Sequence, residues 1–240
     1  MSDGGAATLV VLSLNEVEAL GKLLPLVPRD LFTAVIAIDA GSTDGTLDLY
    51  RAAGIPVHIQ AERGRGKAFV WSLDLVTTPY VVFLSADGNE DPADLPGFLR
   101  ALRAGCDMVI GGRFVLAGSQ TDMSDDPFGL RKLGAIAFGV LVRLLYRSGV
   151  WDSTNGYRGF RVESMRRMAL DAAGHAIEFQ STIRATKLGM NIKEIPTHEL
   201  TRMGGERKDT AGTWRLGAET LRCLVRELVL GRRFLSDSVR

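Results

Sequence analysis

The sequence has few of the residues that build disulfide frameworks or zinc sites, and it carries almost no net charge. It contains two cysteines, Cys106 and Cys223, and three histidines. Two cysteines make no disulfide framework and fit a reducing compartment. The histidines are too scattered for a zinc site. A formal net charge of +1 gives no indication of a nucleic-acid partner.

Long apolar segments are also missing from the sequence. No apolar run reaches the ~18 residues of a membrane-spanning helix. The first apolar run, in MSDGGAATLVVLSL, has no basic residue before it, so we expect no signal peptide. These absences favour a cytoplasmic protein and leave open a peripheral contact with a membrane.

Short apolar runs alternate with helical patterns through the first half of the chain. Such alternation predicts an α/β fold with a mostly parallel central sheet flanked by helices. A chain of 240 residues is long enough for one such domain. Asn15 precedes the first helical segment and is a candidate N-cap. The predicted strands cover residues 9–14, 34–39, 57–60, 80–84 and 107–111, and the helices cover 16–26, a segment ending at 53, 66–76 and 92–104.

The second half of the chain is less regular. Residues 118–128 predict a polar loop, 191–198 one more strand, and 130–146 and 213–230 two helices. The run 133–142 is uncharged and has basic residues on both sides. The last helix is amphipathic. Its apolar face holds Leu221, Leu224, Val225 and Leu228, and its charged face holds Arg215, Glu219, Arg222 and Arg226.

Polar residues follow three of the predicted strands at the point where each strand ends. The fourth strand ends in Ser85-Ala86-Asp87-Gly88-Asn89, the first in Asn15-Glu16, and the second in Asp39. In a parallel sheet these strand ends meet at the edge where ligands bind. An aspartate and an amide at that edge suit a divalent cation held against a diphosphate.

Two further features belong to the same edge. Asp39 ends a buried strand, where an ionised acid is costly unless a partner uses it. After it, Ser42 and the Asp44-Gly45 pair are as compatible with binding a nucleobase and ribose as with a plain helix cap at Ser42 and a turn at Asp44-Gly45. The segment Arg63-Gly64-Arg65-Gly66-Lys67 opens a helix, and a helix N-terminus suits an anionic ligand, although the spacing is not that of a Walker loop.

Together these segments resemble the family-2 glycosyltransferases of GT-A type, in particular the dolichol- and polyprenol-phosphate mannose and glucose synthases. The resemblance covers roughly residues 8–208 and implies a Rossmann-like GT-A fold. Three later segments carry the resemblance to this subgroup. They are Gly112-Arg113-Phe114, Asp152-Ser153-Thr154-Asn155-Gly156-Tyr157-Arg158 and Arg202-Met203-Gly204-Gly205-Glu206-Arg207-Lys208.

The resemblance implies a role for each matching residue. Asp87 and Asn89 would hold Mg²⁺ or Mn²⁺ on the donor diphosphate. The catalytic set would be Asp87 with cations around the acceptor phosphate and the leaving diphosphate, namely Arg113, Arg131, Arg202 and Lys208. The nucleotide-sugar set would be Asn15, Glu16, Asp39, Ser42, Gly66, Lys67, Ser85 and Ala86, with Asp39 at the base. Relatives commonly have an aspartate where this chain has Ser85, so we expect weak metal affinity without nucleotide.

The implied reaction is transfer of a hexose from a nucleotide sugar, of GDP-mannose or UDP-glucose type, to polyprenyl or dolichyl phosphate. A phosphate acceptor is already ionised near neutral pH, so it needs no general base, and direct displacement inverts the anomeric centre. Two alternatives remain open. One is a soluble saccharide acceptor with Glu178 as the base, and the other is a non-catalytic nucleotide-sugar-binding subunit, suggested by Ser85.

A lipid acceptor requires contact with the membrane. We expect a catalytic domain over residues 1–212 and an amphipathic helix with a basic tail over 213–240. The uncharged run 133–142 and the last helix are candidates for binding at the cytoplasmic membrane surface. Packing of the last helix on the protein's own core would give the same sequence pattern. The sequence leaves the sugar, the nucleotide and the oligomeric state open.

Overall fold

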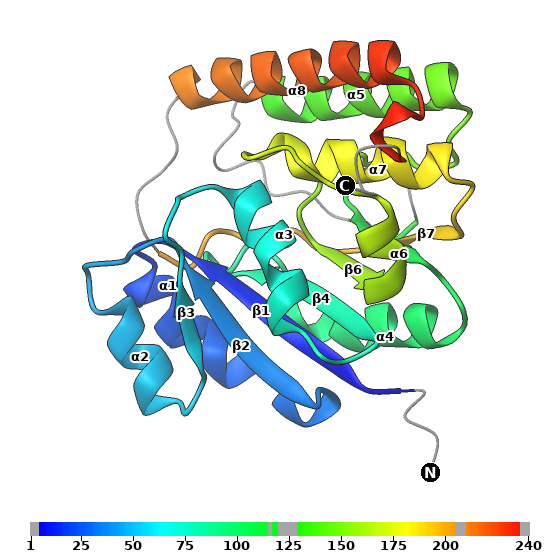
Figure 1. Ribbon diagram of the computed structural model, residues 1–240. Coiled ribbons are helices and arrows are strands. Elements are labelled where there is room, and N and C mark those ends of the chain that lie inside the picture. The colour runs from blue at the N-terminus through cyan, green and yellow to red at the C-terminus, as the bar shows by residue number, and fades with distance from the viewer. Residues whose placement is uncertain (1–4, 115–116, 120–128, 205–209, 236–240) are drawn as a thin grey trace.

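A seven-stranded sheet runs through the centre of the molecule (Figure 1). The computed structural model describes residues 5–114, 117–119, 129–204 and 210–235. The strands lie in the order β3-β2-β1-β4-β6-β5-β7. Their bounds are β1 Ala7–Ser13, β2 Ala34–Asp39, β3 Val57–Ile59, β4 Tyr80–Ser85, β5 Met108–Gly112, β6 Arg158–Arg161 and β7 Ile192–Pro196.

Most of the strand pairs are parallel, which confirms the α/β fold predicted from the alternating pattern. β1 pairs in parallel with both β2 and β4, and β5 pairs in parallel with β7. The register sets Ser13 beside Asp39 and Leu12 beside Ser85. The ends of β1, β2 and β4, which carry the polar residues, therefore lie at one edge of the sheet.

β6 is antiparallel to both of its neighbours, β4 and β5, and the sequence did not predict it. Its sequence RGFR has no apolar run, since an arginine, Arg158, occupies a fully buried position where an apolar residue would be expected. The guanidinium donates to the hydroxyls of Ser181 and Thr182 at 2.9 and 2.8 Å and to the carbonyls of Ser153 and Asn155 at 2.8 and 2.6 Å. Burial lowers the pKa of Arg158 to about 10. These four hydrogen bonds, two of them to the distant Ser181 and Thr182, make a charged residue tolerable there.

Helices cover both faces of the sheet. One face is covered by α1, α2 and α4, whose core includes Leu20, Tyr50 and Phe98. The other face is covered by α3, α6 and α7, whose core includes Phe69, Met165 and Ile177. The bounds are α1 Val17–Leu23, α2 Thr46–Ala52, α3 Arg65–Leu75, α4 Leu95–Arg103, α6 Val162–Arg167 and α7 Ala176–Lys187.

A third layer lies outside α7, where α5 (Leu130–Tyr146) and α8 (Thr210–Leu230) run across the top of the molecule (Figure 1). Val142, Phe179 and Leu224 form a small core between this layer and α7. Buried from two sides, α7 hides Glu178, Gln180 and Arg184 among its apolar positions. These polar residues interrupt the apolar period, and for this reason the sequence did not predict α7.

The predicted helix boundaries are correct to within a few residues, but one predicted cap is wrong. α1 begins after Glu16 without a side-chain cap, and a 3₁₀ turn over Leu24–Leu26 completes the predicted segment. Asn15 instead accepts the N–H of Thr43 at 2.9 Å, so its side chain joins the ends of β1 and β2. Residues 120–128 of the predicted polar loop lie outside the described residues.

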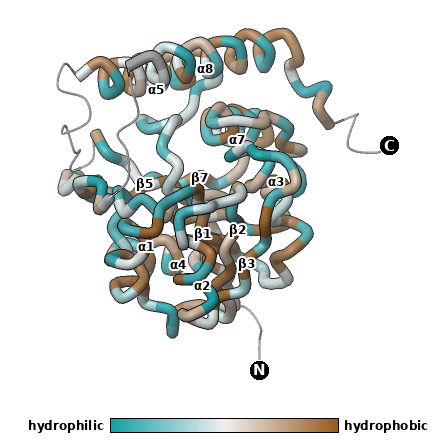
Figure 2. Tube along the Cα trace, turned by 90° about the vertical axis from the view of Figure 1, so that its left-hand side faces the viewer, coloured by the Kyte–Doolittle hydropathy of each residue, from teal (hydrophilic) through white to brown (hydrophobic). Residues whose placement is uncertain are grey.

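The face by which α8 packs is not the apolar face identified in the sequence. Thr220, Cys223, Leu224 and Glu227 are buried against α7. Of the predicted apolar set only Leu224 packs inward, while Leu221, Val225 and Leu228 are 47–53% exposed. The buried face of α8 therefore includes the charged Glu227, and the face with Leu221, Val225 and Leu228 points outward. Figure 2 shows hydrophobic segments along both helices of this outer layer.

Candidate active site

Hydrogen bonds around Asp39 tie together the ends of β1 and β2. Its fully buried carboxylate accepts from the hydroxyls of Ser13 and Ser42 at 2.7 and 2.6 Å and from the N–H groups of Gly41 and Ser42 at 2.8 and 2.6 Å. The Ser42 hydroxyl oxygen also accepts the N–H of Asn15 at 2.8 Å. These bonds offset the cost of burying the acid. They fix the relative positions of Asn15, Asp39 and Ser42, whose nucleotide-binding roles stay predictions.

Asp87 and Asn89 follow β4 and form an oxygen-rich site. Asp87 Oδ1 accepts the N–H of Asn89 at 3.3 Å, and Asp87 Oδ2 lies 3.1 Å from Nη1 of Arg202. Asn89 Oδ1 is buried and has no hydrogen-bond partner among the described residues. A buried amide oxygen without a partner needs a ligand, and hard cations such as Mg²⁺ take carboxylate and amide oxygens. The residues present therefore fit a divalent cation.

Ser85, which stands where relatives commonly carry an acid, lies against the carboxylate of Glu90. The Ser85 N–H donates to Glu90 Oε2 at 2.6 Å, and its hydroxyl lies 3.2 Å from both Glu90 Oε1 and Nη1 of Arg65. Burial raises the pKa of Glu90 to about 7, against the opposing charge of Arg65. Arg65 is also ion-paired with the buried Glu178. The next residue, Ala86, is buried and donates its N–H to Leu12.

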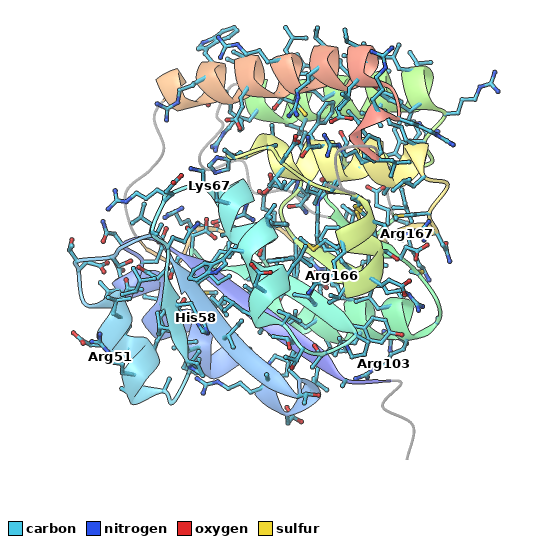
Figure 3. The ribbon with its side chains drawn as sticks, in the orientation of Figure 1. Arg51, His58, Lys67, Arg103, Arg166 and Arg167 are labelled. Atoms are coloured by element: carbon cyan, nitrogen blue, oxygen red, sulfur yellow. The ribbon has the colours of Figure 1, made fainter. Side chains whose placement is uncertain are left out.

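The N-terminus of α3 is already occupied by a protein group. The N–H groups of Gly66 and Lys67 both donate to the carbonyl of Ala173, at 2.9 and 3.2 Å. A Cβ atom at Gly66 would overlap the carbonyl of Ala172, so a glycine is required for this approach. Lys67 stands at the N-terminal end of α3 (Figure 3) and is ion-paired with Glu62. Arg65 is thus the member of this motif that reaches the site.

Arg113 is held in a fixed direction by buried acids. Its Nε and Nη2 contact the two oxygens of Asp152 at 2.7 and 3.0 Å. Asp152 is fully buried, and its own N–H donates to Glu194 at 3.0 Å. Burial alone would lower the pKa of Arg113, but the charges of Asp152 and Glu199 raise it overall. A bidentate pair of this kind fixes the guanidinium plane as well as its position.

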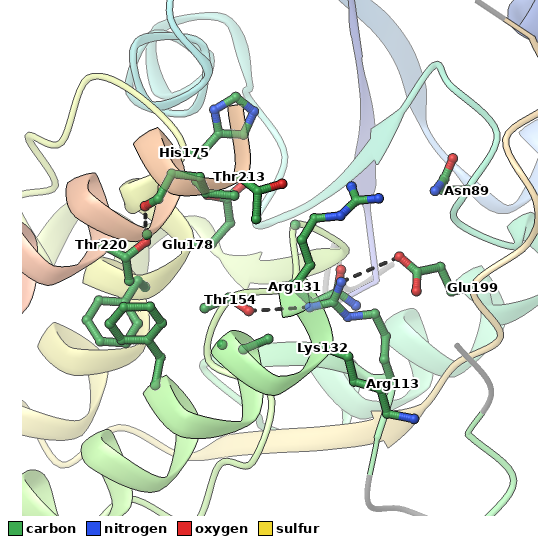
Figure 4. A pocket seen from close by; sticks show the side chains of 18 of the residues that line it. Asn89, Arg113, Arg131, Lys132, Thr154, His175, Glu178, Glu199, Thr213 and Thr220 are labelled. Atoms are coloured by element: carbon green, nitrogen blue, oxygen red, sulfur yellow. Dashed lines mark hydrogen bonds and ion pairs between the residues drawn. The ribbon is translucent and has the colours of Figure 1, made fainter. Parts of the chain in front are cut away.

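One cavity of about 700 Å³ joins these groups. It is lined by five of the predicted residues, namely Ser85, Asp87, Asn89, Arg113 and Arg131, and Figure 4 shows several of them facing it. Among the described residues, the other predicted ones are not part of the lining. These are Asn15, Glu16, Asp39, Ser42, Gly66, Lys67, Ala86 and Arg202. Lys208 lies outside the described residues.

The far end of the cavity is apolar. Leu130, Ala135 and Phe138 of α5 line it, together with Trp214 and Leu221 of α8. The same cavity therefore has oxygen-rich groups and Arg113 at the sheet, Arg131 and Lys132 at the start of α5, and a mostly apolar lining between α5 and α8.

Sequence reasoning missed several residues of the site. Arg65, Glu90 and Glu199 line the cavity but were given no role, although Arg65 lies within a segment that was singled out and Glu90 directly follows another. In the sequence, nothing distinguished these charged residues from their charged neighbours. The contact of Arg65 with Ser85 appears only in the fold. Glu178 was considered only as a base for a soluble acceptor.

Comparison with known proteins agrees with this geometry. The family model described as Glycosyl transferase family 2 matches residues 8–168. The chain is 31% identical over 220 residues to an undecaprenyl-phosphate mannosyltransferase of Micrococcus luteus, covering 85% of this chain and 87% of that protein. It is 30% identical over 204 residues to the glycosyltransferase AglJ of Haloferax volcanii, covering 83% of this chain but 65% of that protein.

A solved structure has the same fold. The glucosyl-3-phosphoglycerate synthase of Mycobacterium tuberculosis, crystallised with Mn²⁺ and UDP-glucose, superposes with a TM-score of 0.75 at 21% identity, over 93% of this chain and 79% of that one. The family match covers well over half of the sequence. This chain therefore belongs to glycosyl transferase family 2 and is a glycosyltransferase with a GT-A fold.

Proposed function

We propose that the protein transfers a hexose from a nucleotide-diphosphate sugar to a polyprenyl phosphate, with inversion at the anomeric carbon. The observation that carries the proposal is the two-ended cavity. Its sheet end offers Asp87, Asn89 and Arg113, and its other end is an apolar space between α5 and α8. A polyprenyl phosphate has the matching parts, a phosphate joined to a hydrocarbon chain.

At the donor end, Asp87 and Asn89 would hold Mg²⁺ or Mn²⁺. The metal would supply positive charge to the departing diphosphate. In the described part of the chain, no three His, Cys, Asp or Glu side chains gather into a metal site, so the donor phosphates would supply further ligands. The Mycobacterium tuberculosis relative, which contains Mn²⁺ and UDP-glucose, supports this arrangement.

At the acceptor end, Arg113 and Arg131 would bind the lipid phosphate. Both line the cavity, and Asp152 holds Arg113 rigid. Two anions repel each other, so a fixed cation between them lowers the barrier to their approach. The phosphate oxygen is ionised near neutral pH and needs no base. The mannosyltransferase relative of Micrococcus luteus is named for undecaprenyl phosphate, which supports a lipid acceptor.

A soluble saccharide acceptor is the second candidate, and one observation favours it. Glu178 lines the cavity, is 3% exposed, and has one carboxylate oxygen without a hydrogen-bond partner among the described residues. A sugar hydroxyl would need such a base. The other oxygen is ion-paired with Arg65, and this pairing favours a structural role for Glu178.

The two candidates separate in a transfer assay. We expect the purified protein with Mg²⁺ and GDP-mannose or UDP-glucose to label undecaprenyl or dolichyl phosphate, giving a product of inverted configuration. Because no base is needed, Glu178→Gln should lower this rate by about tenfold or less, whereas loss of a general base costs roughly 10²- to 10⁴-fold. A lipid product of retained configuration, or labelling of soluble saccharides alone, would reject the proposal.

The outer layer is the proposed contact with the cytoplasmic face of the membrane. Leu133 and Leu144 of α5 and Trp214 and Val229 of α8 are 65–78% exposed. Exposed apolar side chains gathered on two helices mark an interaction surface, and basic residues on the same helices favour anionic lipid. Within the described ranges, none of the helices has both the length and the hydropathy of a membrane-spanning segment.

Vesicle flotation tests this contact. We expect the double variant Leu144→Asp/Val229→Asp to bind anionic vesicles at least about tenfold less than the wild type, because burying even one large apolar side chain is worth roughly 1.5–3 kcal/mol. Leu26→Asp is the matched control, since Leu26 is 56% exposed but follows α1 on the opposite face of the sheet. Equal losses in both variants, or no loss in either, would reject α5 and α8 as the membrane contact.

A further inference from the structure

The acid proposed to bind the metal is already paired with a cation of the protein. Arg202 Nη1 lies 3.1 Å from Asp87 Oδ2, and its Nη2 is ion-paired with Glu16. All three side chains are 80% or more buried. Arg202 therefore bridges two acids that both belong to the predicted donor site.

The segment that carries Arg202 is bound to the metal-site loop by its backbone. The N–H of Leu200 donates to the carbonyl of Asn89 at 2.8 Å, and the N–H of Met203 donates to the carbonyl of Asp87 at 3.1 Å. Gly88 has a φ of +79°, and a Cβ there would collide with Met203. The backbone of the segment is thus held in place. The long side chain of Arg202 is the part that would move, giving up its contacts with the two acids and its Nε–H bond to the carbonyl of Gly204 at 2.7 Å.

A divalent cation and this guanidinium compete for the same oxygen. A metal ion on Asp87 Oδ2 would stand within a few ångströms of a positive charge, and like charges at that distance repel strongly in a partly buried site. The metal can bind only when Arg202 leaves or when added negative charge compensates for it. A nucleotide diphosphate brings such charge and gives the guanidinium a new partner, since arginine binds phosphate oxygens well.

We infer that Arg202 holds the place of the metal ion on Asp87 in the empty enzyme and moves to phosphate when the metal–nucleotide complex binds. The inference rests on the proposed function and deepens it. Arg202 does not line the cavity in its present position, so its charge would reach the donor diphosphate, and the acceptor phosphate that binds beside it, only after the donor has arrived. The structure thereby couples donor binding to acceptor binding, with the donor first.

Metal binding without nucleotide tests the competition directly. We expect Arg202→Gln to bind Mn²⁺ roughly tenfold more tightly than the wild type in calorimetry, within the usual range of couplings between sites. Arg202→Lys keeps the charge and should stay near the wild type. Arg51→Gln is the matched control, since it removes the same charge from α2, away from the site (Figure 3). Unchanged Mn²⁺ affinity in Arg202→Gln would overturn the inference, even if the variant melts at a lower temperature.

Acceptor binding tests the coupling. With farnesyl phosphate as the probe, we expect Mg²⁺ and nucleoside diphosphate to tighten its binding to the wild type by about fivefold or more, and to have a smaller effect on Arg202→Gln. Equal tightening in both proteins would overturn the coupling. A wild type that no nucleotide sugar stabilises in the presence of metal would instead reject the proposed function, whereas the Mn²⁺ comparison would still report on Arg202.

Discussion

Asp87→Asn is expected to lower the transfer rate by roughly 10²- to 10³-fold, the usual effect of removing one charge-stabilising group from an active site. The variant keeps the shape of the side chain but removes the negative charge from the oxygen-rich end of the cavity. Without that charge the site loses its strongest ligand for a divalent metal. The rate is measured with Mg²⁺, the donor and a polyprenyl phosphate.

Asp91→Asn is the matched control for this variant. Asp91 lies in the same loop, and its side chain accepts the N–H of Ala93 at 2.9 Å, a bond that asparagine can keep. A thermal shift by nucleotide sugar that depends on Mg²⁺ should disappear in Asp87→Asn and persist in Asp91→Asn. If Asp87→Asn retained wild-type transfer and the metal-dependent shift, Asp87 would not be the metal ligand.

Glu227→Ala should lower the free energy of unfolding by about 3–5 kcal/mol, the range found when one partner of a buried ion pair is removed. Glu227 is fully buried on α8. Its Oε1 accepts Nε of Arg184 at 2.9 Å, and its Oε2 lies 2.7 Å from Nζ of Lys187. Alanine would leave two buried cations on α7 without their main partner. Urea unfolding measures the loss.

A neighbouring ion pair provides the control for Glu227. Arg226 pairs with Asp171, but both side chains are about half exposed, so Arg226→Ala should cost about 1 kcal/mol or less. Because α8 forms one wall of the cavity, Glu227→Ala should also weaken substrate binding, whereas Arg226→Ala should not. A Glu227→Ala protein as stable as Arg226→Ala would contradict a stabilising role of Glu227 between α7 and α8.

Much of the sheet and part of the site were predictable from local patterns. The apolar runs ending at Ser13, Asp39 and Ser85 became neighbouring parallel strands, since the alternation of strand and helix leaves few other arrangements. That topology placed Asp87 and Asn89 at the ligand-binding edge before any contact was known. Arg113 and Arg131 came from the family resemblance, and the structure brings both to the same cavity.

Two elements that the sequence missed, β6 and α7, share one property, namely polar residues at buried positions. β6 contains the buried Arg158, and α7 contains Glu178, Gln180 and Arg184. Each of these polar residues has at least one partner distant along the chain, such as Ser181 for Arg158 and Arg65 for Glu178. The packing face of α8 was misjudged for the same reason, because it includes the buried Glu227. A hydrophobic period records only whether neighbouring residues prefer burial, so it cannot reveal a charge that is buried with a distant partner.

The sequence by itself therefore determined the α/β class, the edge of the sheet at which the polar strand ends meet, and the position of Asp87 and Asn89 at that edge. Only the tertiary structure decided that Arg202 pairs with Asp87 across 115 residues, that Glu90 lies against Ser85, and that Leu221 and Leu228 of α8 stay about half exposed. The physical reason is the distance along the chain between the residues that determine each feature. Strand and helix periods arise between near neighbours, whereas the partner of a buried charge is chosen by how the whole chain folds.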